Sequence, residues 1–262
     1  MSVLLHISDT HFGAHQPAVV DALIALAARQ QPHVAVLSGD ITQRARPGQF
    51  RAAKDFVDRL GIPVLAVPGN HDIALFDLWS RLTRPYAQFS RVFGSDLEPV
   101  FRSPDLLIAC VKTTRRWRHR HGEVSAAQIE RVARLLGTAS PQQLRLVVVH
   151  QPAASPPSVK WNSLLRGHRA ALRAWSAAGA DLVLGGHEHL PGTLAQGGLP
   201  RRLWVVQAGT AVSARTHAGA PNSVNILRWD GAASCVIEQW DFAPQQRAFV
   251  LASATHIHPE RN

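Results

Sequence analysis

The sequence L-V-L-G-G-H-E-H-L-P-G at residues 182–192 joins an apolar run to two glycines and two histidines. Residues 182–184 are short, apolar and bounded by turn residues, a pattern typical of a buried strand. The glycines allow a sharp turn where the strand ends. His187 and His189 are two positions apart, so an extended segment places both on one side and Glu188 on the other. The two histidines either bind metal or belong to an ordinary turn.

The same pattern, a strand-like run followed at once by polar side chains, recurs at four other places. The runs cover residues 3–8, 34–38, 64–67 and 146–149, each short and apolar with turn residues at its edges. In an α/β sheet the carboxyl ends of strands line the ligand crevice, so all five ends are expected to converge. The polar groups that follow the four runs are, in order, Asp9-Thr10-His11, Gly39-Asp40, Gly69-Asn70-His71-Asp72 and His150.

The segments between these runs carry helical patterns. Residues 17–30 and 47–60 each begin with proline and repeat apolar residues at helical spacing, and Ser125 with Gln128 forms a capping box for a helix that Gly137 ends. A further helix is expected over residues 164–178. The alternation of strands and helices predicts an α/β fold, with two packed sheets and helices outside. Further strands are expected at residues 106–111, 203–206, 224–229 and 234–240.

The domain organisation expected from these patterns is a single domain over residues 1–242. Residues 243–262 read as a loosely packed C-terminal tail, and no linker or repeat divides the chain.

Composition limits the class of protein. The chain has 262 residues, 46% of them hydrophobic, which is enough for one well-cored domain. No apolar run approaches the roughly 20 residues that span a bilayer, and the two cysteines lie in strand-like stretches, so a cytoplasmic location without a membrane span is expected. The formal charge of +10 favours anionic partners such as phosphates, nucleotides or nucleic acid.

Seven side chains at the strand ends can bind metal. They comprise two carboxylates, four imidazoles and one amide oxygen, too many for a single tetrahedral zinc ion. The set suits two divalent ions that share a carboxylate, and mixed nitrogen and oxygen ligation favours manganese, iron, zinc or cobalt over calcium. Two such ions form a clamp for in-line attack at phosphorus. The seven residues are Asp9, His11, Asp40, Asn70, His150, His187 and His189.

In order and wording, these motifs resemble the calcineurin-like metallophosphoesterases. The family pattern is D-x-H, G-D, G-N-H-D or G-N-H-E, a lone H, and G-H-x-H. The chain matches it with DTH at 9–11, GD at 39–40, GNHD at 69–72, His150 and GHEH at 186–189. The resemblance implies a four-layer αββα sandwich with two mixed sheets and a dinuclear metal site at the strand carboxyl ends.

Carried over residue by residue, the resemblance divides the ligands between two metals. It makes Asp40 the bridging ligand and His71 the catalytic histidine, and it implies in-line attack on a phosphodiester by a metal-bridging hydroxide. The first metal would take Asp9, His11, Asp40 and His189, and the second Asp40, Asn70, His150 and His187.

Within the family, the motif sequences most resemble those of bacterial class III cyclic-nucleotide phosphodiesterases, as in HISDTHFG, SGDITQRARPGQF and QAGTAVSARTHAGAPNSVNIL. A small, cyclic-nucleotide-like diester is therefore the expected substrate. Gln43 stands where related protein phosphatases carry an aspartate that orients the catalytic histidine, which disfavours a protein phosphatase. A nuclease acting on DNA or RNA and a phosphomonoesterase stay open as alternatives. A non-enzymatic scaffold is disfavoured, because the chain keeps all seven ligands and His71.

Three further features carry weaker predictions. Arg44 and His217 are placed near the substrate, Arg44 because it closely follows Asp40 and His217 because it follows a strand and its turn. The run RRWRHRH at residues 115–121 is either a nucleic-acid-binding loop or, as favoured here, a solvated connection. The oligomeric state stays open, with a homodimer among the alternatives.

Overall fold

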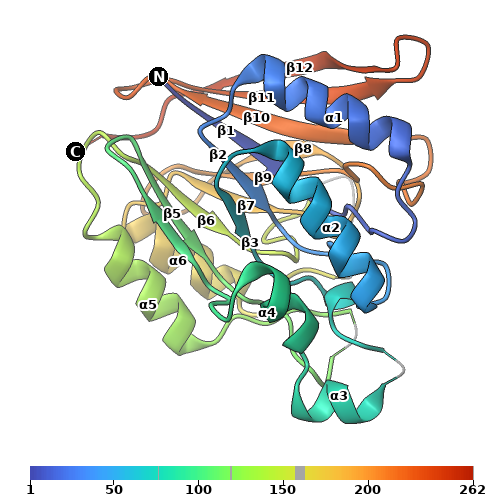
Figure 1. Ribbon diagram of the computed structural model, residues 1–262. Coiled ribbons are helices and arrows are strands. Elements are labelled where there is room, and N and C mark those ends of the chain that lie inside the picture. The colour runs from blue at the N-terminus through green and yellow to red at the C-terminus, as the bar shows by residue number, and fades with distance from the viewer. Residues whose placement is uncertain (76, 119, 157–162, 262) are drawn as a thin grey trace.

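Two six-stranded sheets form the centre of the protein (Figure 1). The computed structural model describes residues 1–75, 77–118, 120–156 and 163–261. The first sheet has the strand order β12-β11-β10-β1-β2-β3 and the second the order β4-β5-β6-β7-β9-β8. The strands of the first sheet are β1 Ser2–Ile7, β2 Val34–Leu37, β3 Val64–Ala66, β10 Ser223–Trp229, β11 Cys235–Ala243 and β12 Ala248–Ile257. Those of the second are β4 Val100–Arg102, β5 Leu106–Cys110, β6 Leu144–Val148, β7 Leu182–Gly185, β8 Gly192–Gln196 and β9 Leu203–Gln207.

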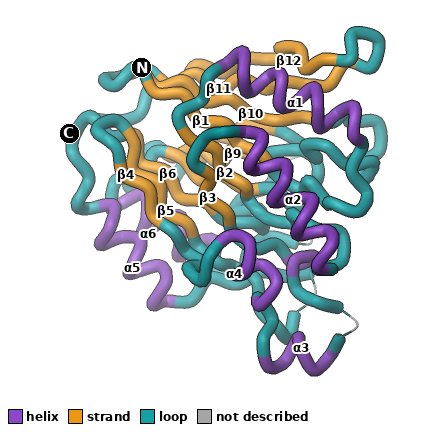
Figure 2. The backbone as a smooth tube through the Cα atoms, in the orientation of Figure 1, coloured by secondary structure: helices purple, strands orange, loops and turns teal. Residues whose placement is uncertain are grey.

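Helices cover the outer face of each sheet, as the tube in Figure 2 also shows. Helices α1 and α2 lie against the first sheet, and α5 and α6 lie against the second. The short helices α3 and α4 and the 3₁₀ turn η1 follow β3. The bounds are α1 Pro17–Gln30, α2 Pro47–Leu60, η1 Asn70–Asp72, α3 Leu78–Thr83, α4 Ala87–Phe93, α5 Ala126–Leu136 and α6 His168–Ala177.

Alternating side chains of the strands build three apolar layers. In β1, Val3 and Leu5 pack with α1 and α2, whereas Leu4 packs between the two sheets. In β6, Leu146 faces the space between the sheets and Val147 faces α5 and α6. Because successive strand residues point to opposite faces, each buried strand contributes to two layers. The predicted αββα sandwich of four layers is confirmed.

Both sheets are mixed, and their parallel strands point toward one edge of the sandwich. In the first sheet β1, β2 and β3 are parallel, and β10 pairs antiparallel with β1. In the second sheet β5, β6, β7 and β9 are parallel, and β4 and β8 are antiparallel. The carboxyl ends of these parallel strands carry the polar groups that the sequence singled out.

The C-terminal segment is one place where the sequence interpretation is wrong. Residues 248–257 are not a loosely packed tail, because they form β12, which pairs antiparallel with β11 along its length. Strand β12 is the edge of the first sheet, and six consecutive residues, 251–256, are exposed. Residues 252–256, A-S-A-T-H, include no large apolar side chain, and so they read as a tail in the sequence. Phe249 and Ile257, which are buried, fix the strand at both ends.

Candidate metal centre

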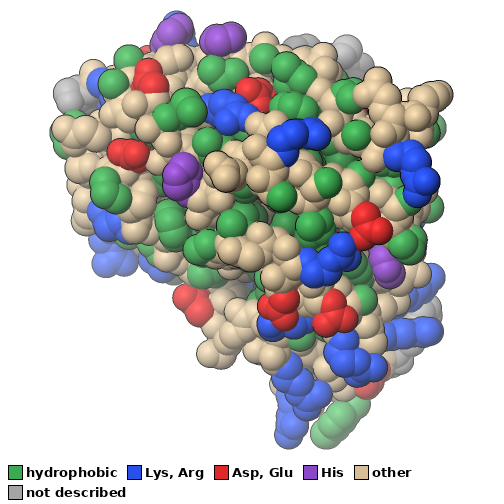
Figure 3. All heavy atoms as spheres, turned by 45° about the horizontal axis from the view of Figure 1, so that its top comes forward, with side chains coloured by type: hydrophobic (Ala, Val, Ile, Leu, Met, Phe, Trp, Pro, Cys, Tyr) green, Lys and Arg blue, Asp and Glu red, His purple; other side chains and the backbone are tan. Residues whose placement is uncertain are grey.

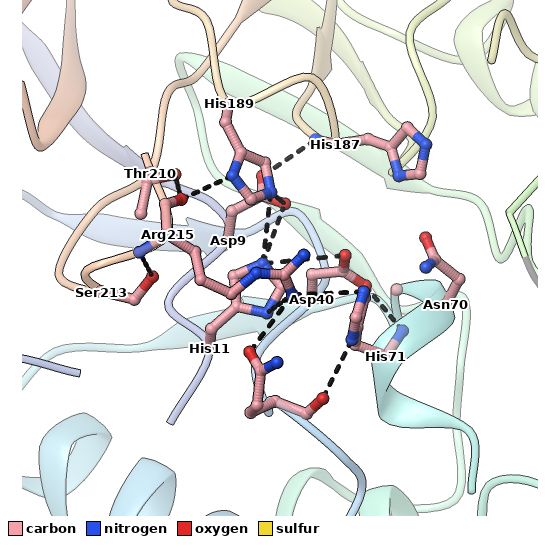
Figure 4. Close-up of polar contacts among 12 residues, drawn as sticks. Asp9, His11, Asp40, Asn70, His71, His187, His189, Thr210, Ser213 and Arg215 are labelled. Carbon is pink, nitrogen blue, oxygen red and sulfur yellow. Dashed lines mark hydrogen bonds and ion pairs between the residues drawn. The ribbon is translucent and has the colours of Figure 1, made fainter. Parts of the chain in front are cut away.

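The predicted ligands come together in two groups. Asp9, His11, Asp40 and His189 form one group, and Asp40, His150 and His187 form the other; within each group the ligand atoms lie within 4.8 Å of one another. Asp40 belongs to both groups, as the bridging role requires. Asn70 adjoins the second group, with its Oδ1 3.2 Å from His150 Nε2. Figure 4 shows most of these side chains pointing into one space between the strand ends.

Five of the seven residues adopt a left-handed backbone conformation. Only eight non-glycine residues in the described parts of the chain have positive φ, so the concentration at this site is high. Such conformations cost L residues free energy and persist where the surroundings hold them, often at functional sites. The turns that leave the strands are thus bent sharply inward. The five are Asp9 (φ 51°), His11 (42°), Asp40 (48°), His187 (76°) and His189 (58°).

Close approach of the strand-end loops depends on two glycines. A Cβ at Gly69 would lie 2.8 Å from Asp40 Cα and nearer still to Asp40 N, and one at Gly186 would lie 2.5 Å from Asp9 Oδ2. Contacts between non-bonded carbon atoms are normally about 3.5–4.0 Å. Side chains at these two positions would therefore push the ligand loops apart.

In the first group, an imidazole nitrogen and a carboxylate oxygen face each other. His189 Nδ1 donates to the carbonyl of Arg215 at 2.6 Å, which leaves its Nε2 without a proton in the neutral ring. That Nε2 lies 3.2 Å from Asp9 Oδ1, a buried oxygen with no hydrogen-bond partner among the described residues. Burial opposes charge on His189, but the Asp9 carboxylate outweighs it and raises the pKa of the imidazole. His11 Nε2 lies 3.3 Å from His189 Nε2.

The second group repeats this arrangement. His150 Nδ1 donates to the carbonyl of Ser38 at 2.8 Å, and its Nε2 lies 3.2 Å from Asp40 Oδ1. Burial lowers the pKa of His150, but the Asp40 carboxylate outweighs burial and raises this pKa to about 9. His187, whose Nδ1 is 3.3 Å from His150 Nε2, has its pKa lowered to about 3, first by burial and then by His150.

The donor set fits two divalent cations. In each group an imidazole nitrogen faces a carboxylate oxygen at 3.2 Å, and a positive charge, from a metal ion or from a proton on the ring, offsets the negative charge between them. The opposite ring nitrogens of His150 and His189 are held by backbone carbonyls, which is how metal-binding histidines are usually oriented. Buried aspartates without a cation would cost much free energy, and Asp9 and Asp40 are both buried.

His71 stands beside this cluster and belongs to neither group. Its Nδ1 donates to the carbonyl of Gln43 at 2.9 Å, and its backbone N–H donates to Asp40 Oδ1 at 2.8 Å. The ring packs edge-on against His11, with 4.9 Å between centroids. The carbonyl of Gln43 thus orients His71, although the residue at this position is not aspartate.

Asp72 connects the loops that carry Asp40 and Asn70. Its Oδ2 accepts from the N–H groups of Ile41 and Gly69 at 3.0 and 2.9 Å. Its Oδ1 accepts from the N–H and the hydroxyl of Thr42, both at 2.8 Å. The carboxylate therefore has a structural role at the site.

Arg215 is the residue that the sequence interpretation missed. Its Nη1 lies 3.4 Å from His71 Nε2, 3.4 Å from His11 Nδ1 and 3.2 Å from Gln43 Oε1. Its carbonyl accepts from Thr210 Oγ1 as well as from His189. The loop after β9 is therefore a sixth segment at the carboxyl end of a strand that contributes to the site. The only signal in the sequence is an arginine soon after a predicted strand, two positions before His217.

The weaker predictions fall near the site. His217 is exposed and lines a cavity of about 440 Å³ over the cluster, together with Arg120 and Glu188. Arg44 lines a neighbouring cavity with His71. Glu188 was expected to point away from the metals in an extended segment, but it lines the cavity over the cluster and hydrogen-bonds with Ser163, because His187 and His189 have left-handed rather than extended backbone. Contact of Arg44 or His217 with a substrate stays a prediction.

The basic run at residues 115–121, of which His119 lies outside the described residues, is mostly bound within the chain. Arg115 donates to Gln128, Arg116 to the carbonyl of Leu82, and Arg118 pairs with Glu123 at 3.3 Å. On the face in Figure 3, Lys and Arg side chains lie at several separate places, with acidic side chains among them. The contacts of Arg115, Arg116 and Arg118 within the chain favour a connecting loop over a nucleic-acid surface.

Comparison with known proteins agrees with the geometry. The model of the calcineurin-like phosphoesterase family matches residues 2–191. A cAMP/cGMP dual specificity phosphodiesterase of Mycobacterium tuberculosis is 27% identical over 202 residues, which cover 71% of this chain and 61% of that protein. The glycerophosphodiester phosphodiesterase GpdQ of Enterobacter lignolyticus is 37% identical over 83 residues, which cover 27% of this chain and 29% of that protein. The chain thus matches less than two thirds of either relative's length.

Solved structures share the fold. A dimetal phosphatase from Danio rerio superposes with a TM-score of 0.68 at 16% identity, covering 99% of both chains. A purple acid phosphatase from yellow lupin gives a TM-score of 0.66 at 10% identity, covering 98% of this chain and 53% of that one. No helix in the described ranges is long and apolar enough to cross a bilayer.

Proposed function

Because the chain belongs to the calcineurin-like phosphoesterase family, we propose that it is a metal-dependent hydrolase of phosphodiester bonds in small nucleotide-like substrates. The strongest support is the pair of ligand groups that share Asp40, with His71 beside them. Names of relatives add support, since the two described above are phosphodiesterases.

Two divalent cations, drawn from manganese, iron, zinc or cobalt, fit the cluster. When bound, such ions offset charge on the phosphoryl oxygens and lower the pKa of the attacking water. We assign the first ion to Asp9, His11, Asp40 and His189, and the second to Asp40, Asn70, His150 and His187.

His71 is proposed to act on the leaving group. Its Nδ1–H is held by the carbonyl of Gln43, so its Nε2 is directed toward the cavity that it lines. When both ring nitrogens are protonated, the proton on Nε2 can pass to the departing ester oxygen, which leaves the ring neutral with its proton on Nδ1, and no covalent intermediate is needed. Arg215, 3.4 Å from the same Nε2, is placed to donate to a phosphoryl oxygen in a charge-assisted hydrogen bond.

The alternatives have weaker support. A nuclease would need a track of free cations, and three arginines of the basic run are bound within the chain. That the diester is a cyclic nucleotide is a more specific proposal than hydrolysis of a phosphodiester. It rests on similarity of sequence motifs and on the name of one relative.

The test is hydrolysis of bis-p-nitrophenyl phosphate by the protein loaded with manganese, compared with p-nitrophenyl phosphate. His71→Ala should lower kcat by about 10²–10⁴ while metal content stays at the wild-type level. His256→Ala, an exposed histidine on β12, serves as the matched control and should change neither. A metal-loaded wild type inactive on the diester would refute the proposal. Loss of metal in His71→Ala would refute the separation of roles.

Cyclic AMP and single-stranded DNA should be digested side by side under the same conditions. We expect turnover of the small diester. Degradation of DNA without turnover of cyclic AMP would favour the nuclease over the phosphodiesterase that acts on small diesters.

A further inference from the structure

Two cavities meet at the centre of the site. Their volumes are about 440 and about 370 Å³, each within the range of small-molecule sites. Both are lined by Asn70, His71 and Arg215, so these three residues form the junction between them. Since His71 and Arg215 are the groups placed to act on the phosphoryl group, phosphorus is expected at this junction.

Arg215 is held at the junction from both ends of its side chain. Its backbone carbonyl accepts hydrogen bonds from His189 and Thr210, and its guanidinium reaches Gln43 Oε1 at 3.2 Å (Figure 4). A guanidinium anchored in this way separates the two cavities and offers each of them donor groups.

The walls of the two cavities differ in chemistry. The first is lined by the proposed metal ligands Asp40, His187 and His189. It also carries Arg120, Glu188 and His217, three polar side chains that suit a hydroxyl-rich or charged substituent. The second carries Arg44 together with Ile73 and Leu75, a combination that suits a flat or apolar substituent with a polar edge.

We propose that the site takes an acyclic phosphodiester, with one substituent of the phosphorus in each cavity. The proposal rests on the proposed diesterase function and narrows its substrate class. In an acyclic diester the two ester groups leave phosphorus in different directions, which matches two cavities that diverge from one junction. In a cyclic nucleotide both ester oxygens belong to one sugar, so the substrate would use one cavity and leave the other empty.

The first test varies the substrate and needs no variant. Phenyl p-nitrophenyl phosphate and methyl p-nitrophenyl phosphate share a leaving group and differ in the second substituent. Burying a phenyl ring in place of a methyl group should raise kcat/KM at least about ten-fold. Activity on neither compound by the manganese-loaded protein refutes the diesterase function itself. Equal activity on both, within about two-fold, refutes only the two-cavity proposal.

The second test fills each cavity in turn. Leu75→Trp narrows the second cavity and Ala218→Trp the first. Leu82→Trp on α3 and Ala195→Trp on β8 are matched controls, because both positions are exposed and lie outside the two cavities. At least one filling variant should abolish the preference for the phenyl diester, and both controls should keep it. Retention of the preference in both filling variants would overturn the proposal.

Equilibrium binding gives a readout independent of turnover. Calorimetry with bis-p-nitrophenyl phosphate is carried out in the His71→Ala background. Each filling substitution should raise Kd by about ten-fold or more, whereas each control should leave it within about two-fold. Unchanged Kd in both filling variants contradicts the proposal. A higher kcat/KM for cyclic AMP than for any acyclic diester also contradicts it.

Discussion

Replacing Gly69 with alanine should separate the two loops that carry Asp40 and Asn70. The backbone of Gly69 is extended (φ −89°, ψ −179°), so alanine can adopt it and the effect is purely steric. The added Cβ would lie 2.8 Å from Asp40 Cα, and closer to Asp40 N and Oδ1. Restoring ordinary contact requires the loops to move apart by about 1 Å. Asp40 N and Cα are backbone atoms, so the backbone itself must shift.

We expect Gly69→Ala to lower the free energy of unfolding by about 3 kcal/mol, the upper end of the range for overpacked substitutions. An unfolding entropy of about 2 cal/mol/K per residue converts this, for 262 residues, to a fall in Tm of about 5 °C. Metal affinity should fall at least about a hundred-fold, because Asp40 serves both ions and metal–ligand distances tolerate only about 0.2 Å.

The assay combines thermal unfolding with a chelator-competition titration of manganese. Gly48→Ala is the matched control, because Gly48 lies within α2 with only the end of Arg51 near its added Cβ, at 3.6 Å. It should be neutral or stabilising by up to about 1 kcal/mol. A Gly69→Ala protein that binds two ions with wild-type affinity and melts within about 1 °C of wild type would refute the steric argument.

Three further predictions follow from protonation and burial. Burial lowers the pKa of His6 to about 3 from 6.5, so the stability that neutral His6 contributes is complete above pH 6.5 and is lost as pH falls. The unfolding free energy lost between pH 7 and pH 5 should therefore be about 2 kcal/mol smaller in His6→Gln than in wild type. Equal losses in urea titrations of the two proteins would contradict this. The pKa of His150 is raised to about 9, so metal binding at pH 7 should release about one proton from this ring. Calorimetry in buffers of different ionisation enthalpy measures the release, and no release would show that the ring is neutral before metal binds. Burial raises the pKa of Cys110 above its usual range and that of Cys235 to about 12, so a thiol reagent should label neither in the native protein and both in denaturant; native labelling would show local opening.

Local signals in the sequence were sufficient for the helices that flank the first sheet. The bounds Pro17–Gln30 and Pro47–Leu60 agree with expectation, because proline at the first turn and a left-handed residue after the last turn mark both ends. The capping box of Ser125 and Gln128 also forms as predicted. The helix expected over residues 164–178 is shorter and begins at His168. These features depend on residues within one turn of one another.

Features that depend on distant parts of the chain were missed. Strand β12 is exposed at six of its ten residues, and its pairing with β11 makes it a strand. Strand β8 likewise pairs with β9 and has no apolar run of its own. Arg215 reaches His71 across 144 positions of sequence. No local periodicity records such contacts, whereas the ligand motifs were visible because each follows a strand directly.

The left-handed backbone at five of the seven ligands sets a limit on engineering this protein. Each such residue costs about 1 kcal/mol, so the cluster holds about 5 kcal/mol that glycine would release. Selection for heat resistance alone would therefore favour glycine at these positions. The metal-binding imidazoles and carboxylates would then be lost. Thermostabilisation is better directed to exposed positions of β12, where neither the turns nor the metal centre constrains the choice of residue.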